Sequence, residues 1–203
     1  IVGTSDLPDN THPNAAFRWT EQGGMEAVGP VENPLSPDCV WTGEHGLAIS
    51  DDGTTIVGSS NDNELPRNGC TDRPFRFTEE EGAIGLGLFG RELSRAHAVS
   101  ADGSIVAGIS RNLFSDPTLP MVWQWHADTG EFTDLGYSAS DDGQTFVRDM
   151  TPDGSHVIGY GREVGLRHPF LWTQEDGMTP LSVPSYPWGI SDDGSVIVGG
   201  LLL

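Results

Sequence analysis

The sequence AISDDGTTIVG occupies residues 48–58, and close variants of it recur at three further places in the chain. They read AVSADGSIVAG at 98–108, DMTPDGSHVIG at 149–159 and GISDDGSVIVG at 189–199. Each copy contains a short strand, an Asp-Gly turn and a second strand, and Asp-Gly is a strong local signal for a β-hairpin. The repetition therefore predicts a chain built from similar hairpins, separated by stretches that differ from copy to copy.

A second motif alternates with the hairpin. It reads AFRWT at 16–20, PFRFT at 74–78, VWQWH at 122–126 and PFLWT at 169–173, and a glycine-containing turn follows each copy. The spacing leaves no room for helices of about ten residues, so we predict four short strands in each repeat unit. We expect the aromatic side chains of this motif to pack between units rather than to stack on carbohydrate; they are Trp19, Phe77, Trp125 and Trp172.

The second strand of each hairpin is apolar throughout: TIVG, SIVAG, HVIG and SVIVG show no alternation with polar residues. Continuous apolar strands indicate sheets that are covered on both faces. Four-stranded antiparallel sheets of this kind, repeated every 40 to 51 residues, are typical of β-propeller blades. The sequence thus predicts an all-β protein with a single repeat domain over residues 1–203. The approximate repeats are 1–44, 45–94, 95–146, 147–187 and the partial repeat 188–203.

The count of expected strands is seventeen, one more than a closed ring of four blades would use. Residues 188–191 could complete the first sheet beside Ile1, but the apolar strand 195–199 would then have no partner, which natural proteins avoid. We therefore expect these four to five repeats to belong to a longer propeller or array. Further blades before Ile1 or after Leu203, or a neighbouring copy of the chain, would complete it.

The charge of the chain excludes several functions. Thirty acidic residues face ten basic ones, all of them arginine, and the net charge is −20. Such a surface repels phosphate, so we expect no nucleic-acid binding and no attraction to anionic membranes. No apolar run approaches the roughly 18 residues of a membrane span, and no signal peptide is visible. The chain starts at Ile, which indicates a processed protein or a fragment.

Long loops are predicted to share one face of the propeller. Strands alternate in direction, so the short turns inside each hairpin lie on one face and the remaining connections on the other. These remaining connections are long and irregular, and loops of this kind commonly carry function. They are residues 6–14, 30–44, 61–73, 111–120 and 137–148.

The motifs for specific chemistry are weak. The Asp-Gly turns are explained by the backbone conformation that Asp and Gly adopt, rather than by metal binding. Asp62, Asn63 and Glu64 are candidate Ca²⁺ ligands, although the EF-hand spacing is absent. No HExxH, C-x-x-C or G-x-S-x-G occurs, so the sequence identifies no catalytic residue, zinc site or cofactor site. His97 and His156 lie within expected strands, where packing is a simpler role than chemistry.

Two cysteines, Cys39 and Cys70, fall in long loops of neighbouring repeats. A Cys39–Cys70 disulfide would suit an oxidising compartment, and two reduced thiols are the alternative.

The segments RHPFLWTQEDGMTPL, AAFRWTEQGGM and ISDDGSVIVG resemble the HAF repeat of extracellular repeat proteins. This chain departs from the family's His-Ala-Phe motif, because Pro169 stands between His168 and Phe170 and the other copies lack the histidine. The resemblance covers nearly the whole chain and implies secretion or surface display. It implies no enzymatic activity.

We therefore expect an extracellular or cell-surface module, not an enzyme, with a binding, display or structural role. Its long loops would contact a glycan or a surface protein. The alternative is a polysaccharide-active enzyme, a glycosidase or a lyase, that uses acidic loop residues.

Overall fold

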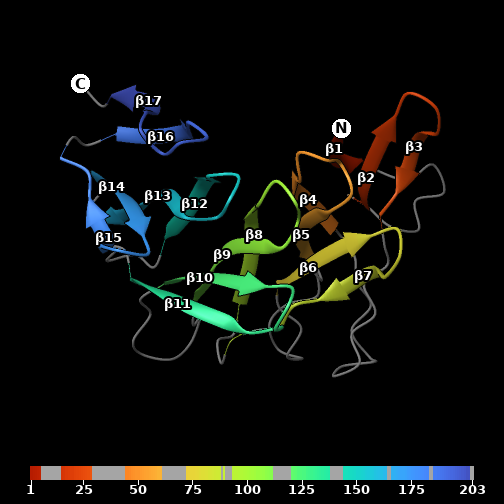
Figure 1. Cartoon of the computed structure of the whole chain (residues 1–203), viewed down its shortest axis with the longest axis horizontal. Coiled ribbons are helices and arrows are strands. Elements are labelled where there is room, and N and C mark those ends of the chain that lie inside the picture. The colour runs from red at the N-terminus through yellow and green to blue at the C-terminus, as the bar shows by residue number, and fades with distance from the viewer. Residues whose placement is uncertain are drawn as a thin grey trace.

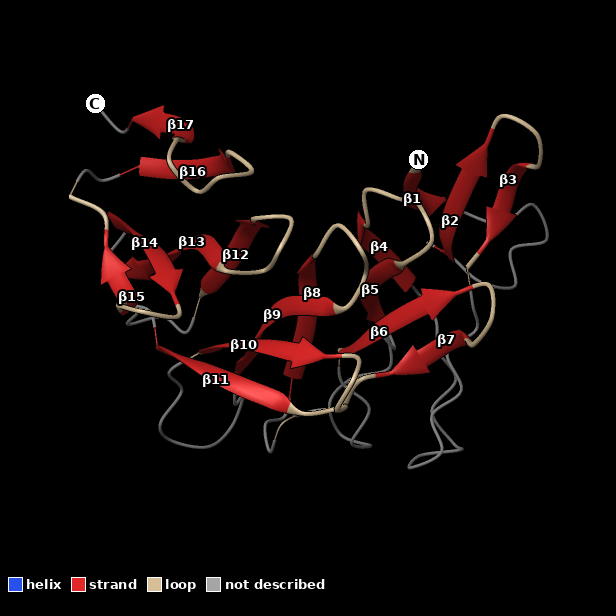
Figure 2. Cartoon of the chain, in the orientation of Figure 1, coloured by secondary structure: helices blue, strands red, loops and turns tan. Residues whose placement is uncertain are grey.

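The computed structural model describes residues 1–5, 15–28, 44–60, 72–87, 89, 93–111, 120–137, 144–163, 166–182 and 185–201. Every regular element in these ranges is a β-strand, and no helix occurs among them (Figure 2). The prediction of an all-β protein is confirmed.

The strands form five antiparallel sheets in chain order, which we number as blades 1 to 5 (Figure 1). Blade 1 contains β1 (Val2–Ser5), β2 (Ala15–Thr20) and β3 (Gly24–Ala27). Blade 2 contains β4 (Glu44–Ile49), β5 (Ile56–Ser60), β6 (Arg73–Thr78) and β7 (Gly82–Gly85). Blade 3 contains β8 (Leu93–Val99), β9 (Ile105–Arg111), β10 (Met121–His126) and β11 (Phe132–Tyr137). Blade 4 contains β12 (Thr145–Met150), β13 (His156–Glu163), β14 (Leu166–Thr173) and β15 (Gly177–Pro180). Blade 5 contains β16 (Ser185–Ile190) and β17 (Ile197–Leu201).

The blades are arranged around a common centre. The first strands β4, β8, β12 and β16 lie on the inner side, and β4 contacts β8, β8 contacts β12, and β12 contacts β16. The fourth strands β7, β11 and β15 lie at the outer rim (Figure 1). First strands begin one to three residues before the repeat boundaries expected from the sequence, because the hairpin motif covers only the second half of each strand.

The described strands form an open arc rather than a closed ring of four blades. Strand β1 pairs with β2, and β16 pairs with β17; no described ladder joins blade 1 to blade 5. These two blades stand at opposite ends of the arc (Figure 1). Closure through residues 188–191 beside Ile1 is therefore not found.

The core lies between neighbouring blades. Trp125 of β10 is 7% exposed and shares a buried cluster with Val57 of the preceding blade, and Trp172 shares one with Ala107. Phe77 packs against the cluster between blades 1 and 2. The expected inter-blade role of these aromatic residues is thus found in three copies. Trp19, the copy in blade 1, is 41% exposed because no described blade precedes it.

The glycine of each Asp-Gly turn has a backbone conformation that other residues rarely adopt, with φ of +73° at Gly103 and +74° at Gly53. Gly103 also lies against the preceding blade, where an added Cβ would fall 2.1 Å from Thr55 Oγ1. Gly154 approaches Ile105 in the same way. The turn glycine thus serves both the hairpin and the contact between blades.

The alanine substitution Gly103→Ala should reduce the free energy of unfolding by at least about 2 kcal/mol. The positive φ costs about 1–2 kcal/mol, and the clash with Thr55 adds roughly 1–3 kcal/mol of overpacking. Gly53→Ala is the matched control, because Gly53 has the same conformation but no atom within 4 Å of an added Cβ. Urea unfolding should show the smaller loss for the control, and equal losses would contradict the packing role.

Candidate functional site

Each inner strand contains a β-bulge at the same position of the repeat. The ladder skips one residue between Gly46 and Ala48, and equivalent shifts occur in β8, β12 and β16. Bulges redirect side chains and are frequent beside functional sites. The residues two and three positions after each bulge are similar from copy to copy, whereas the skipped residues differ completely in chemistry. They are Leu47, His97, Arg148 and Trp188.

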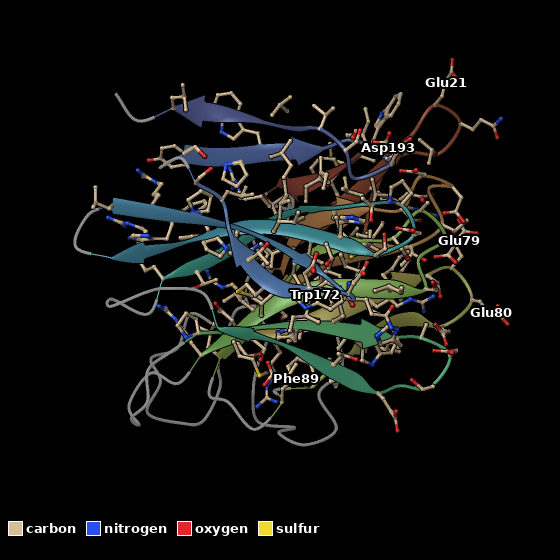
Figure 3. All side chains as sticks on the ribbon, turned by 60° about the vertical axis from the view of Figure 1, so that its left-hand side comes forward. Glu21, Glu79, Glu80, Phe89, Trp172 and Asp193 are labelled. Carbon is tan, nitrogen blue, oxygen red and sulfur yellow. The ribbon has the colours of Figure 1, made fainter. Side chains whose placement is uncertain are left out.

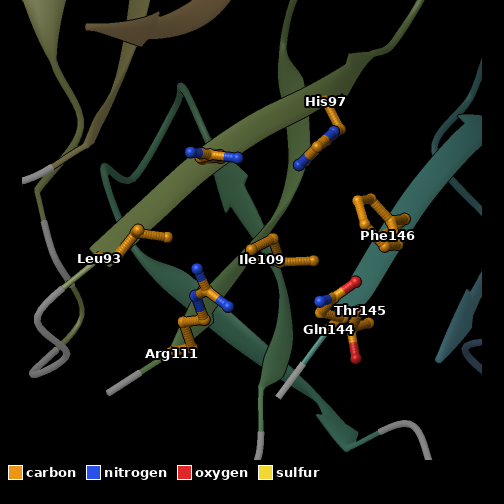
Figure 4. Close-up of a pocket in the computed structure, with 8 residues that line it drawn as sticks. Leu93, His97, Ile109, Arg111, Gln144, Thr145 and Phe146 are labelled. Atoms are coloured by element: carbon orange, nitrogen blue, oxygen red, sulfur yellow. The ribbon is translucent and has the colours of Figure 1, made fainter. Parts of the chain in front are cut away.

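A cavity of about 200 Å³ lies beside the bulge of blade 3, between β8, β9 and β12 (Figure 4). His97 lines it from β8, Arg111 from the end of β9, and Gln144 from the residue just before β12. Strand β9 ends at Arg111 and β12 begins at Thr145, so the cavity is at the long-loop face of the propeller. The lining residues are Leu93, Arg95, His97, Ile109, Arg111, Gln144, Thr145 and Phe146.

His97 is the unusual residue of this cavity. Its Nε2 atom is buried and has no hydrogen-bond partner among the described residues, although buried polar atoms are normally paired. Desolvation, and next the positive charges of Arg95 and Arg148, lower the pKa of His97 to about 4. The imidazole is therefore neutral at pH 7. The sequence indicated a packing role for this residue, and the structure adds that its buried Nε2 atom lies beside the cavity without a partner among the described residues.

Arginine side chains surround the histidine. The guanidinium of Arg95 pairs with the buried carboxylate of Asp72. Arg162 Nη1 donates a hydrogen bond to Gln144 Oε1 at 2.7 Å and so fixes the orientation of the amide. Together with Arg111, these groups give the described part of the cavity more positive than negative charge. In a chain with a net charge of −20, this concentration of arginine is exceptional.

The opposite face, which carries the short turns, is acidic. Glu21, Glu79, Glu80 and Asp193 all lie along this edge of the molecule (Figure 3). A larger hollow of about 670 Å³ opens here, and both arginines that line it are held in ion pairs. Arg18 binds Glu26 at 2.9 Å and Glu79 at 2.5 Å, and Arg76 binds Glu81. Unlike this hollow, the cavity at His97 contains a buried imidazole nitrogen without a partner among the described residues.

The Asp-Gly turn that recurs in the repeats has a structural explanation. Asp102 Oδ1 accepts hydrogen bonds from Ser100 Oγ at 2.8 Å, from Ser104 N at 2.9 Å and from Ser104 Oγ at 2.7 Å. The same pattern occurs at Asp52, Asp153 and Asp193. The carboxylate thus fixes the turn. Within the described ranges, no group of three or more His, Cys, Asp or Glu residues could hold a metal ion.

These turn carboxylates predict how stability depends on pH. Hydrogen bonds from Ser104 and Ser100 lower the pKa of Asp102 from 3.8 to about 2, and similar bonds lower the pKa values of Asp153 and Asp193 to about 2. Since the folded-state pKa is below the unfolded value, the stabilisation is present above about pH 4 and is lost as pH falls toward 2. Thermal melts should show this decline. Asp102→Asn should be less stable at pH 7 and decline less steeply, and an unchanged slope would contradict the assignment.

Two candidate sites from the sequence lie outside the described residues: the proposed Ca²⁺ ligands Asp62, Asn63 and Glu64, and the cysteines Cys39 and Cys70. Both stay predictions. If the disulfide forms, its loop of about 30 residues should contribute roughly 3 kcal/mol to stability. Thiol titration of the unfolded, unreduced protein should find no reactive group, and two reactive groups would reject the bond.

No family model and no curated protein matches the chain. Solved structures do match. TolB from Acinetobacter baumannii aligns with a TM-score of 0.60 and 14% identity, over 98% of this chain and 46% of the TolB chain. A chain of a nidogen–laminin complex aligns with a TM-score of 0.54 and 14% identity, over 92% of this chain and 63% of its own. An oligogalacturonate lyase in complex with manganese aligns with a TM-score of 0.54 and 16% identity, over 99% of this chain and 58% of the lyase chain.

The fold is a β-propeller. TolB and the nidogen chain have this fold, and their similarity extends over nearly the whole of the present chain. The chain spans about half the length of the TolB that it matches. At such low identity the likeness establishes the fold and no activity. No helix in the described ranges is long and apolar enough to cross a membrane.

Proposed function

We propose that this protein is a secreted or surface-displayed propeller module that binds its ligand at the long-loop face, at the inner ends of blades 3 and 4. The observation that carries the proposal is the cavity at His97, where a buried imidazole nitrogen without a partner meets arginine and glutamine side chains. Concave sites with a few convergent polar groups are the usual form of ligand pockets. The repeated residues then build the scaffold, and the residues that vary build the site.

The proposed location outside the cell has support in the sequence. A net charge of −20 suits a protein that must stay soluble among salts and surfaces, and the resemblance to the HAF repeat points to secretion or display. The partner is a glycan or a surface protein. A matched propeller occurs in a nidogen–laminin complex, so this fold is compatible with a protein-binding role.

A glycan array, probed with and without Ca²⁺, tests this proposal. The wild-type chain should give a positive signal, and His97→Phe should remove it because the apolar ring has no nitrogen to bond the ligand. Trp188→Phe, at the equivalent bulge of blade 5, is the matched control and should retain the signal. If the array and a panel of surface proteins both give no signal, or if His97→Phe binds like the wild type, the proposal is wrong.

An enzymatic role is the second candidate, and His97 is the observation that favours it. A neutral imidazole that lines a cavity can accept a proton from a substrate and so act as a general base. A polysaccharide-active enzyme would release new reducing ends or unsaturated sugars from an acidic polysaccharide, and His97→Ala would abolish this release. If the protein binds the polysaccharide but releases no sugar product, the result would support the binding module over the enzyme.

We also propose that a neighbouring blade covers each end of the arc. Ile1, Trp19 and Met25 are exposed on blade 1, and Val196, Val198 and Leu201 are exposed on blade 5. In the interior of the arc the equivalent faces are buried against the next blade. A second copy of the chain could supply both missing neighbours.

A further inference from the structure

Two arginine residues occupy directly opposite positions on β13 and β14. They are Arg162 and Arg167, which are partners in the ladder, so both side chains start from the same face of the sheet. We propose that they form a binding site for an oxyanion, the sulfate or phosphate group of a larger ligand, at the long-loop end of blade 4. This site goes beyond the proposed function, because it is separate from the cavity at His97.

The arginine pair has no counter-charge of its own. Like charges directly opposite each other destabilise a sheet. Within the described ranges, the ion pairs of arginine with an acidic side chain use Arg18, Arg76 and Arg95, and none reaches this pair. The chain has 30 acidic and 10 basic residues, so an arginine pair without an acidic partner is exceptional. An external anion would supply the charge that the chain does not.

Both guanidinium groups retain donors for a ligand. The Nε atoms of Arg162 and Arg167 have no hydrogen-bond partner in the described part of the chain, and buried donors of this kind are normally paired. An arginine donates two parallel hydrogen bonds from one edge of its planar group, which suits an oxyanion. Both residues are only partly buried, so a ligand can approach them from solvent.

Neighbouring side chains hold both groups in place. Arg162 Nη1 donates a hydrogen bond to Gln144 Oε1 at 2.7 Å, and the edge that carries Nε remains for a ligand. Arg167 lies over the Tyr186 ring, with Cζ 3.4 Å from the ring centre, and a stacked guanidinium keeps its donors in the plane. Tyr186 belongs to β16, so the site lies where blade 5 meets blade 4. Side chains that are already held lose less conformational freedom on binding.

The arrangement favours a tetrahedral group over a carboxylate. A carboxylate has two oxygens, and a single arginine can occupy both. A sulfate or phosphate ester has three terminal oxygens, so two guanidinium groups on neighbouring strands can share it. The net charge of −20 disfavours a polyanion, and we therefore expect a ligand with one or a few such groups.

Thermal unfolding in the presence of inorganic sulfate or phosphate tests the inference. Binding with a dissociation constant of about 1 mM should raise the wild-type midpoint by about 3 °C or more at a ligand concentration of about 10 mM. Sodium chloride brings every sample to the same ionic strength. Arg162→Gln and Arg167→Gln should each lose this rise. Arg148→Gln, which makes the same charge change at an exposed position of blade 4, is the matched control and should retain it.

The comparison between variants decides, because sulfate also stabilises proteins in general by exclusion from their surface. If both glutamine variants at the site keep the rise, or if acetate raises the wild-type midpoint as much as sulfate, the inference is wrong. If Arg162→Gln does not fold, Arg167→Gln gives the answer, since it leaves the bond to Gln144 intact. His97→Phe should keep the rise, so failure of this site and failure of the proposed function are distinguishable.

Titration with galactose 6-sulfate, galactose 6-phosphate and galactose identifies the source of the group. Tighter binding of the sugar sulfate than of inorganic sulfate would support a sulfated glycan as ligand. Tighter binding of the sugar phosphate than of inorganic phosphate would support a phosphorylated ligand. If neither sugar ester binds more tightly than its inorganic ion, the site takes an adventitious ion only, and the inference is overturned.

Discussion

Replacing Trp125 by alanine should lower the free energy of unfolding of the monomer by about 3–5 kcal/mol, whereas the same replacement of Trp19, measured at a protein concentration too low for copies to associate, should cost about 1 kcal/mol or less. The two tryptophans occupy the same position in their repeats. Trp125 is 7% exposed in the cluster between blades 2 and 3, and Trp19 is 41% exposed at the end of the arc. Large losses of stability arise when a substitution leaves a cavity in a close-packed core. Removing a partly exposed ring leaves a smaller cavity, and the loss of stability is smaller too.

Urea unfolding, followed by far-UV circular dichroism, measures both variants under the same conditions. The pair separates the effect of the inter-blade contact from the effect of removing an indole from this strand position. If Trp19→Ala is as damaging as Trp125→Ala, then Trp19 is covered in solution, and a neighbouring blade must cover it. That result would contradict this prediction and support the proposed neighbour at the end of the arc.

The strand order was predictable because local chemistry determines it. Asp-Gly turns define the hairpins, and the apolar second strands show that both faces of each sheet are covered. The structure explains why these residues recur. The carboxylate of Asp102 needs Ser100 and Ser104 at fixed offsets, and Gly103 needs both its positive φ and the space beside Thr55.

The candidate site was not predictable by the same means. His97 and Gln144 are 47 residues apart in the chain, and only the packing of β8 against β12 brings both to one cavity. The bulge that exposes His97 to the cavity is a property of strand register, which a single strand does not reveal. One signal was present: residues 47, 97, 148 and 188 differ in every copy, although the repeated motif begins within two residues of each of them.

The end faces of the arc lead to the prediction of head-to-tail association. Inside the chain, the aromatic residue of one blade shares a buried cluster with the second-strand residue of the blade before it, as Trp125 does with Val57. Trp19 and Val198 are the two halves of this same contact, and they are 41% and 57% exposed. A second copy would bury Trp19 of one chain against Val198 of the next. We expect the sedimentation coefficient of the wild-type protein to rise with concentration.

Two single variants distinguish this head-to-tail contact from a dimer in which the same end face of both copies meets. Trp19→Asp and Val198→Asp should each abolish association alone, because each leaves only one type of functional end. Mixed in equal amounts, they should form a heterodimer, since one variant retains the blade 5 face and the other retains the blade 1 face. Leu166→Asp removes an apolar side chain that is 56% exposed away from both ends and should associate like the wild type. If instead the same end face of two copies met, only one of the two aspartate variants would lose association, and the mixture would recover nothing.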